Sequence, residues 1–290
     1  MKFTINNDNK AKQFICIFKH LKDLVETCTL IFNKGGLYLQ SMDSTHICLC
    51  ELNLENTWFD NYEYKSESDN ESATIHCQTF HDVISCYKDN NTIIVLFDSK
   101  KNNLNITFTG DKCVLKEFTL LTLDGEDDLM EIPDAEYTAD VCLKSGELAE
   151  LVNELSIFSN DLKFNCDDEW LRMTAKGDNG QMRVNISDEN ILHYQIVEEE
   201  TIELTYSLEY LKRVCSFNKV NDLVDVHINK ELPLKIVYDF DIPEKSKDDE
   251  ESAHFENKKK NYIKFYVAPK LEDDEFYLNT EDWKKTILLK

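Results

Sequence analysis

Residues 36–52 read GLYLQSMDSTHICLCEL, and this stretch decides how the rest of the chain is interpreted. Apolar residues alternate with their neighbours in two runs, LYL (37–39) and ICL (47–49), which is the periodicity of β-strands. Between the runs, SMDSTH (41–46) is rich in the small and acidic residues that form turns. A methionine and a histidine in such a turn indicate an exposed apolar surface that serves a partner.

Composition places the chain among ordinary globular proteins. Its 290 residues suit two domains, and 42% of them are apolar, which is enough for real cores. The formal net charge is -24, from 56 acidic and 32 basic residues. A uniformly acidic surface repels nucleic acid, so a DNA-binding function requires the bases to be gathered in one place.

Targeting and redox signals are those expected of an intracellular protein. The sequence has no apolar run of membrane-spanning length, and the first residues, MKFTINNDNKAKQ, lack the apolar core of a signal peptide. The ten cysteines include no CxxC pair. Most fall in apolar or alternating segments, which predicts reduced thiols packed in the core. We expect no metal and no cofactor, because no second pair completes a tetrahedral site near the His76, Cys77, His81 and Cys86 grouping.

The chain reads as the same plan twice. Apolar spacing predicts helices over 12–24 and 79–87 in the first half, and over 146–158 and 207–217 in the second half. β-rich runs follow each helix, for example 92–97 and 222–229. A repeated unit of helices and many antiparallel strands predicts α+β domains. GDNG (177–180) predicts a tight hairpin rather than a nucleotide-binding loop.

Two blocks of sequence together carry a resemblance to a known family. The first is the opening stretch, 36–52. The second consists of LPLKIVY (232–238) and YIKFYVAPKLED (262–273). Both closely resemble signature hairpins of the proliferating cell nuclear antigen (PCNA) family of sliding clamps, in the family's order. The resemblance covers about residues 1–275.

The resemblance implies two topologically similar clamp domains of α+β class, with helices lining the interior of a ring and antiparallel sheets outside. The N-terminal clamp domain is expected over 1–120, an interdomain connector over 121–135 and the C-terminal clamp domain over 136–275. A polar insertion (243–261) and a tail (276–290) fall outside the family pattern. The insertion has blocks of both charge signs and few apolar residues, which predicts disorder.

The resemblance also implies a partner-peptide pocket. In the family such a pocket takes the short helical turn of client motifs, typically Gln plus an aliphatic and two aromatic residues. An aromatic anchor in an apolar hole supplies the affinity. The matching positions here are Met42, His46, Ile47, Met130, Ile132, Pro233, Tyr266, Ala268 and Pro269.

The family holds duplex DNA through lysine and arginine side chains on the helices that line its hole. The candidate DNA-facing residues here are Lys10, Lys12, Lys19, Lys22, Lys212, Arg213 and Lys219. The chain departs from the family at Asp82, Glu150 and Glu209, which stand where the family has lysine or arginine. The lining is therefore expected to carry charges of both signs. Contacts to phosphates that read no bases allow a ring to slide.

The sequence therefore predicts a DNA sliding clamp, a processivity factor that tethers DNA polymerase and other replication and repair proteins. We expect a homotrimer ring opened by an ATP-driven clamp loader, located in the nucleus, or at cytoplasmic replication sites if the origin is viral. No catalytic residues are predicted, because the sequence has no GxSxG, HExxH or phosphate-binding glycine loop. Two alternatives remain: a specialised subunit of a checkpoint-type heterotrimer, and a clamp-fold interaction scaffold that does not encircle DNA.

Overall fold

The computed structural model describes residues 1–111, 114–124, 129–130, 132, 135–187, 191–240 and 260–270. These residues divide into two units by their contacts. The first unit comprises 1–41, 50–130 and 260–263, and the second comprises 42–49, 131–259 and 264–290. The predicted insertion (apart from residues 260–261) and the predicted tail lie outside the described residues.

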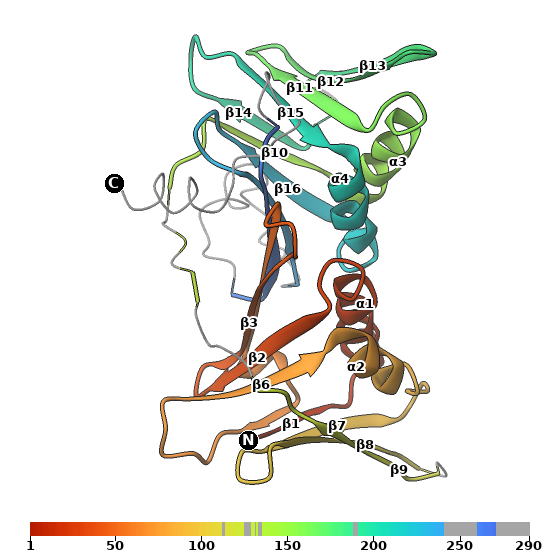
Figure 1. Ribbon diagram of the computed structural model, residues 1–290, viewed down its shortest axis with the longest axis vertical. Helices are drawn as coiled ribbons and strands as arrows, with labels where there is room; N and C mark the ends of the chain where they lie inside the picture. The colour runs from red at the N-terminus through yellow and green to blue at the C-terminus, as the bar shows by residue number, and fades with distance from the viewer. Residues whose placement is uncertain are drawn as a thin grey trace, which may run out of the picture. The chain divides into compact units, whose positions relative to one another are not determined.

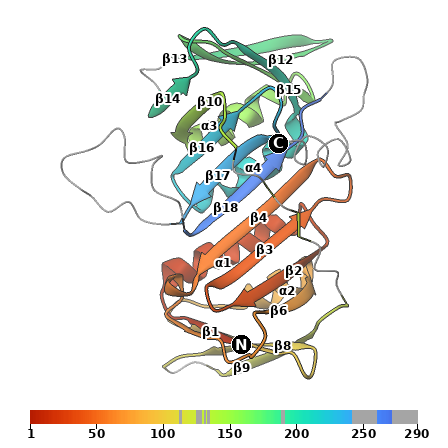
Figure 2. The same cartoon turned by 90° about the vertical axis from the view of Figure 1, so that its left-hand side faces the viewer.

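Among its described residues, the first unit has helices α1 and α2 and strands of two sheets, which can be followed in Figures 1 and 2. The helices are α1 (Asp8–Leu21) and α2 (Cys77–Ile84), with a 3₁₀ turn at Asn56–Trp58. One sheet has the order β5 (Asn61–Glu63), β1 (Lys2–Ile5), β7 (Thr92–Asp98), β8 (Asn103–Thr109) and β9 (Lys116–Leu121). The other strands run in the order β4 (Cys48–Glu55), β3 (Gly36–Met42), β2 (Thr27–Asn33) and β6 (Asn70–His76).

The helices of the first unit lie on one face of the β4-β3-β2-β6 strands, as Figure 2 shows. Helix α1 begins where the Asn7 side chain accepts hydrogen bonds from the N–H groups of Asn9 and Lys10, at 2.9 and 3.1 Å. Its apolar stripe, which includes Phe14 and Phe18, is buried. The Phe14 and Phe18 rings pack edge-on at 5.1 Å, so aromatic contacts fill this core.

Position 36 of the signature hairpin accepts only glycine. Gly36 has a φ of +148°, and a Cβ there would lie 2.1 Å from the Leu54 carbonyl oxygen. The Asn33 carboxamide closes the preceding turn by accepting from the N–H groups of Gly35 and Gly36. The close approach of two backbones therefore explains the glycine in this turn.

The second unit repeats the plan of helices against antiparallel strands (Figure 1). Its helices are α3 (Ser145–Leu155) and α4 (Leu208–Cys215), with a 3₁₀ turn at Ser216–Lys219. Strands run in the order β14 (His193–Ile196), β10 (Ala139–Lys144), β16 (Leu223–Ile228), β17 (Leu234–Asp239) and β18 (Tyr262–Val267). A four-stranded sheet has the order β13 (Gly180–Ser187), β12 (Trp170–Gly177), β11 (Asp161–Cys166) and β15 (Ile202–Ser207).

The predicted α+β class is confirmed, and the predicted GDNG hairpin joins β12 to β13, with Gly177 opposite Gly180. The helix ends differ from the predicted ones. Helix α1 begins at Asp8 rather than at residue 12, because the Asn7 cap starts it one turn earlier. Leu24 lies beyond its end and is buried all the same. None of the helices in the described ranges has the length and hydropathy needed to span a bilayer.

Candidate functional site

The turn between β3 and β4 is organised by one buried carboxylate, Asp43. Its Oδ1 accepts hydrogen bonds from the N–H groups of Ile47 and Cys48, at 2.7 and 2.6 Å. Its Oδ2 accepts from the N–H and the hydroxyl of Thr45. His46, at the tip, has a positive φ of 61° and is exposed. The carboxylate thus satisfies the backbone of the turn from inside, which leaves His46 at the surface.

Asp43 also links this turn to helix α4 of the same unit. The Tyr210 hydroxyl donates to Asp43 Oδ2 at 2.7 Å. Burial acts to raise the pKa of the Asp43 carboxyl, but the donors from Cys48, Thr45 and Tyr210 together outweigh burial and hold the pKa below its ordinary value. Asp43 is therefore ionised at neutral pH, although only 3% of its surface is exposed.

Eight of the nine residues predicted to bind a partner peptide belong to the second unit. Tyr266, Ala268, Pro269 and Ile47 are buried, and the Ala268 N–H donates to the Ile47 carbonyl at 2.9 Å. That bond ties the end of β18 to the turn. Three further members, Met42, Ile132 and Pro233, are half-buried, and His46 is exposed. Met130, the ninth residue, belongs to the first unit.

The segment after Ile132 is fixed to the sheet of the second unit through Tyr137. The Lys235 ammonium lies 4.3 Å from the centroid of the Tyr137 ring, within the range of a cation–π contact. The His227 ring lies on the same tyrosine at 5.6 Å, and His227 Nδ1 is hydrogen-bonded to Asp140. Burial, the largest cause, lowers the pKa of His227 despite Asp140, so this ring is neutral at pH 7.

The predicted DNA-facing bases lie on three elements, α1, α4 and the 3₁₀ turn after α4, and several have local acidic or aromatic partners. Lys10 donates to the Trp58 carbonyl and lies over its ring, and Lys12 pairs with Asp89 at 3.0 Å. Arg213 pairs with Glu209 at 2.5 Å. The remaining members of the predicted set, Lys19, Lys22, Lys212 and Lys219, lie on the same elements or at their ends, and all but the half-buried Lys22 are exposed.

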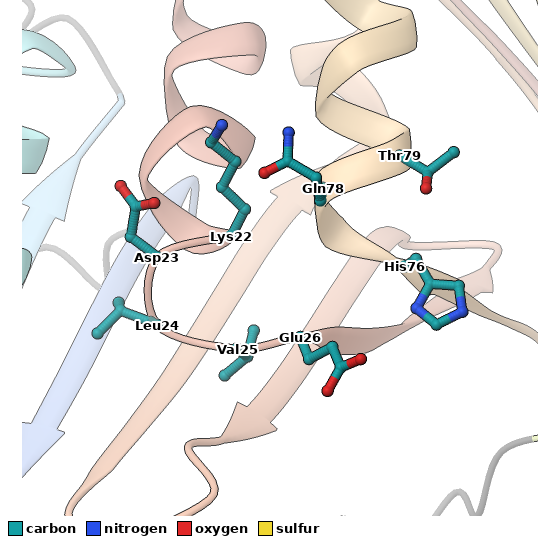
Figure 3. Close-up of a pocket in the computed structure, with 8 residues that line it drawn as sticks. All are labelled: Lys22, Asp23, Leu24, Val25, Glu26, His76, Gln78 and Thr79. Atoms are coloured by element: carbon teal, nitrogen blue, oxygen red, sulfur yellow. The ribbon is translucent and has the colours of Figure 1, made fainter.

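A groove of about 470 Å³ lies beside Lys22, where α1 ends and α2 begins (Figure 3). Its lining combines both charge signs with neutral polar and apolar groups: Lys22, Asp23, Leu24, Val25, Glu26, His76, Gln78 and Thr79. Near it, burial and the charge of Lys22 lower the pKa of His81, so this histidine adds no positive charge at pH 7. The groove presents one fixed cation and two acids, so it lacks the charge of a strong phosphate site.

Two edge strands complete the candidate interfaces. β9 and β13 each end the order of their sheet, so one side of each strand has no neighbouring strand within the described part of the chain. Leu121, the last residue of β9, is 78% exposed. An exposed apolar edge of this kind can pair with another chain. Among the described residues, no group of three His, Cys, Asp or Glu side chains is arranged to hold a metal ion.

Sequence reasoning missed the residues that position these surfaces. The sequence predicts Asp43 only as an acidic residue of a turn, and it does not predict the hydrogen bonds of Asp43 to the backbone of that turn and to Tyr210. An acid within a predicted turn is a recognisable signal for Asp43, because Asp side chains hydrogen-bond to nearby backbone N–H groups. Tyr210 carries no such signal, because its partner lies 167 residues away in the sequence.

Comparison with known proteins assigns both halves of the chain. Residues 7–128 match the N-terminal domain, and residues 131–247 the C-terminal domain, of proliferating cell nuclear antigen. The chain is 26% identical to proliferating cell nuclear antigen 2 of Drosophila melanogaster, over 88% of this chain and 93% of that protein. It is 26% identical to proliferating cell nuclear antigen 1 of Plasmodium falciparum (isolate K1 / Thailand), over 93% and 96%. It is 23% identical to proliferating cell nuclear antigen of Chaetomium thermophilum, over 88% of this chain and 93% of that protein. The chain belongs to the proliferating cell nuclear antigen family of DNA sliding clamps.

Proposed function

We propose that this clamp is a processivity factor that tethers DNA polymerase and other replication and repair proteins through a peptide-binding surface. The surface consists of Met42, His46, Ile47, Met130, Ile132, Pro233, Tyr266, Ala268 and Pro269. The observation that carries the proposal is the Asp43-centred turn, which holds Ile47 against Ala268 and leaves His46 exposed. Apolar side chains held in one geometry suit the aromatic anchor of a short motif.

The proposed assembly is a homotrimer in which β9 of one copy pairs with β13 of the next. Head-to-tail contacts close into a ring when their rotation closes. The two strands carry opposite charges on exposed positions, Glu117 on β9 and Arg183 on β13. An ATP-driven loader would open the ring, the site of action would be nuclear (or cytoplasmic for a virus), and the clamp would have no catalytic activity of its own.

A second candidate function is a clamp-fold scaffold, or a checkpoint-type clamp subunit, with a weak grip on DNA. The ion pairs of Lys12 with Asp89 and of Arg213 with Glu209 favour it, because they reduce the charge available to phosphates. Molecular mass by light scattering separates the candidates. A mass of three chains supports the homotrimer ring, and a stable monomer supports the scaffold.

The peptide surface is tested by Ile132→Asp. We expect the variant to weaken binding of a fluorescent peptide with the Gln-aliphatic-aromatic-aromatic pattern by about 2 kcal/mol or more, because it buries an unpaired charge against the anchor. The measurement is fluorescence anisotropy. The matched control is Val197→Asp, since Val197 lies in the same unit and is 54% exposed. Equal affinities for parent and Ile132→Asp, with both folded, would overturn the proposed surface.

A further inference from the structure

The side chain of Gln40 on β3 takes the place of a neighbouring strand for Met130. Its Oε1 accepts the Met130 N–H at 2.7 Å, and its Nε2 donates to the Met130 carbonyl at 3.0 Å. Paired donor and acceptor bonds to one residue are what a strand partner supplies in an antiparallel ladder. Both residues belong to the first unit. Gln40 therefore fixes the main chain at Met130 without any regular strand there.

A chain of hydrogen bonds sets which way the Gln40 carboxamide faces. Tyr262 and Tyr38 both donate their hydroxyl protons to Glu51 Oε1, at 3.1 and 3.3 Å. The Tyr38 oxygen in turn accepts from Gln40 Nε2 at 3.4 Å. An ionised carboxylate only accepts, so the phenol proton must point to Glu51, and the Gln40 amide nitrogen must point to the phenol oxygen.

The phenols keep the protons that this direction requires. Burial, followed by the nearby Glu51 carboxylate, raises the pKa of Tyr38 and of Tyr262 well above the ordinary value. Both phenols therefore remain protonated, and able to donate to Glu51, at neutral pH. With Nε2 committed to Tyr38 and to the Met130 carbonyl, the Gln40 oxygen is left facing the Met130 N–H.

We propose that Gln40, supported by Tyr38, Glu51 and Tyr262, is a positioning residue for peptide binding. We call these four residues the Gln40 relay. The inference rests on the proposed function, in which Met130 and Ile132 are members of the peptide surface. A fixed Met130 is thus ordered before the peptide arrives, and ordering in advance strengthens binding.

A second attachment of the same segment is made by main-chain atoms, so only the attachment through Gln40 can be removed by a substitution. The Leu123 N–H donates to the Thr74 carbonyl at 2.8 Å, so this earlier part of the same segment is held by main-chain atoms. A side-chain change does not delete that bond. At Met130 the corresponding bonds depend on the Gln40 carboxamide, and a change of Gln40 therefore releases Met130 alone.

The test uses two substitutions of similar size. Gln40→Met removes both hydrogen bonds, and we expect about tenfold weaker peptide binding at every pH. Gln40→Glu keeps the acceptor for the Met130 N–H, but an ionised carboxylate cannot donate to the Met130 carbonyl. We expect binding about tenfold weaker at pH 7.5, with recovery relative to the parent as the pH is lowered toward 5 and the carboxyl gains a proton. Affinity is measured by calorimetry with the same patterned peptide.

Controls separate the relay from general effects. Gln13→Glu makes the same change on α1 of the first unit and should leave affinity at the parent value. Tyr38→Phe should weaken binding about threefold, because the carboxamide loses the partner that orients it. Thermal unfolding midpoints check that each variant is folded.

Each outcome is decisive. Parent affinity in both Gln40 variants overturns the inference, as does a Gln40→Glu variant that follows Gln40→Met at all pH values. If the parent binds the peptide and the Gln40 variants bind it with the same affinity, the result contradicts the inference about Gln40 and leaves the proposed function standing. A parent that binds no peptide overturns the proposed function and the inference with it.

Discussion

At the scale of single residues, the most consequential group is the carboxylate of Asp43. It accepts hydrogen bonds from the backbone N–H groups of Thr45, Ile47 and Cys48, from the Thr45 hydroxyl and from the Tyr210 hydroxyl on α4. Hydrogen bonds to a charged acceptor each contribute about 1.5–3 kcal/mol, and a donor left unpaired in the interior costs a similar amount. The geometry of the proposed peptide surface therefore depends on one side chain that is itself almost inaccessible.

The pKa of Asp43 predicts how its contribution varies with pH. Because the folded pKa is below the ordinary value, the contribution to stability is present at neutral pH and is lost as the pH falls through the folded pKa. We expect Asp43→Asn to lower the free energy of unfolding by about 2 kcal/mol at pH 7, since an amide nitrogen then faces donors. The difference between parent and variant should shrink steadily below pH 4, as measured by urea unfolding.

An exposed acid in the same unit provides the control for Asp43. Asp178→Asn, in the β12–β13 turn, should follow the parent at every pH. If the difference between Asp43→Asn and the parent stayed constant from pH 7 to pH 2, the ionised carboxylate would not be the source of the stability.

At the scale of elements, the two edge strands β9 and β13 predict how copies of the chain associate. We expect Glu117→Lys on β9 and Arg183→Glu on β13 each to shift the mass in solution toward folded monomers, because each puts like charges on the proposed joint. The two changes together restore opposite signs and should recover part of the trimer. Light scattering at several concentrations makes the measurement.

The control for the edges is Lys34→Glu, an equal reversal in the exposed turn between β2 and β3. We expect this control variant to have the same trimer mass as the parent. Trimers that persist in both single edge variants would place the joint on other strands.

The elements themselves could be predicted better than the contacts between them. Apolar periodicity predicts α1, α3 and the strands around the signature hairpin, because burial of one face requires apolar residues at regular spacing in the local sequence. The start of α1 differs from the predicted one because its cap, Asn7, lies outside the apolar pattern. The Tyr210–Asp43 bond and the Gln40–Met130 bonds could not be predicted, because polar partners distant in sequence leave no periodic trace.

At the scale of the whole molecule, the net charge of -24 sets the problem of holding DNA. Attraction to phosphates must come from local groups, and the candidate bases include Lys10, Lys12 and Arg213, which already have partners within their own units. If three copies surround one hole, the remaining lysines repeat around it. Weak and interchangeable contacts of this kind permit sliding.

The DNA prediction concerns four bases together. Replacing Lys19, Lys22, Lys212 and Arg213 with alanine should shorten clamp retention on a circular template and reduce stimulation of a polymerase. Peptide affinity should stay at the parent value, because these residues lie outside the peptide surface. The salt dependence of DNA binding should also become less steep, by about 0.9 in logarithmic slope for each phosphate that the variant no longer neutralises.

A charge-matched variant provides the comparison for DNA binding. Alanine at Lys34, Lys100, Lys101 and Lys230 removes the same charge from turns outside the helices. Equal retention by the two quadruple variants, below that of the parent, would mean that the helix lysines and arginine act only through net charge. Retention at the parent value in both would mean that ring closure alone keeps the clamp on DNA.

The buried thiols give each unit its own reporter of transient opening. Cys28, Cys50 and Cys77 are buried in the first unit, and Cys142, Cys166 and Cys215 in the second. Burial raises the pKa of the Cys166 and Cys215 thiols to about 12, so they are neither accessible nor nucleophilic while the unit stays closed. The alkylation rate of these thiols in native buffer therefore measures how often each unit opens transiently, separately for the two units and without denaturant.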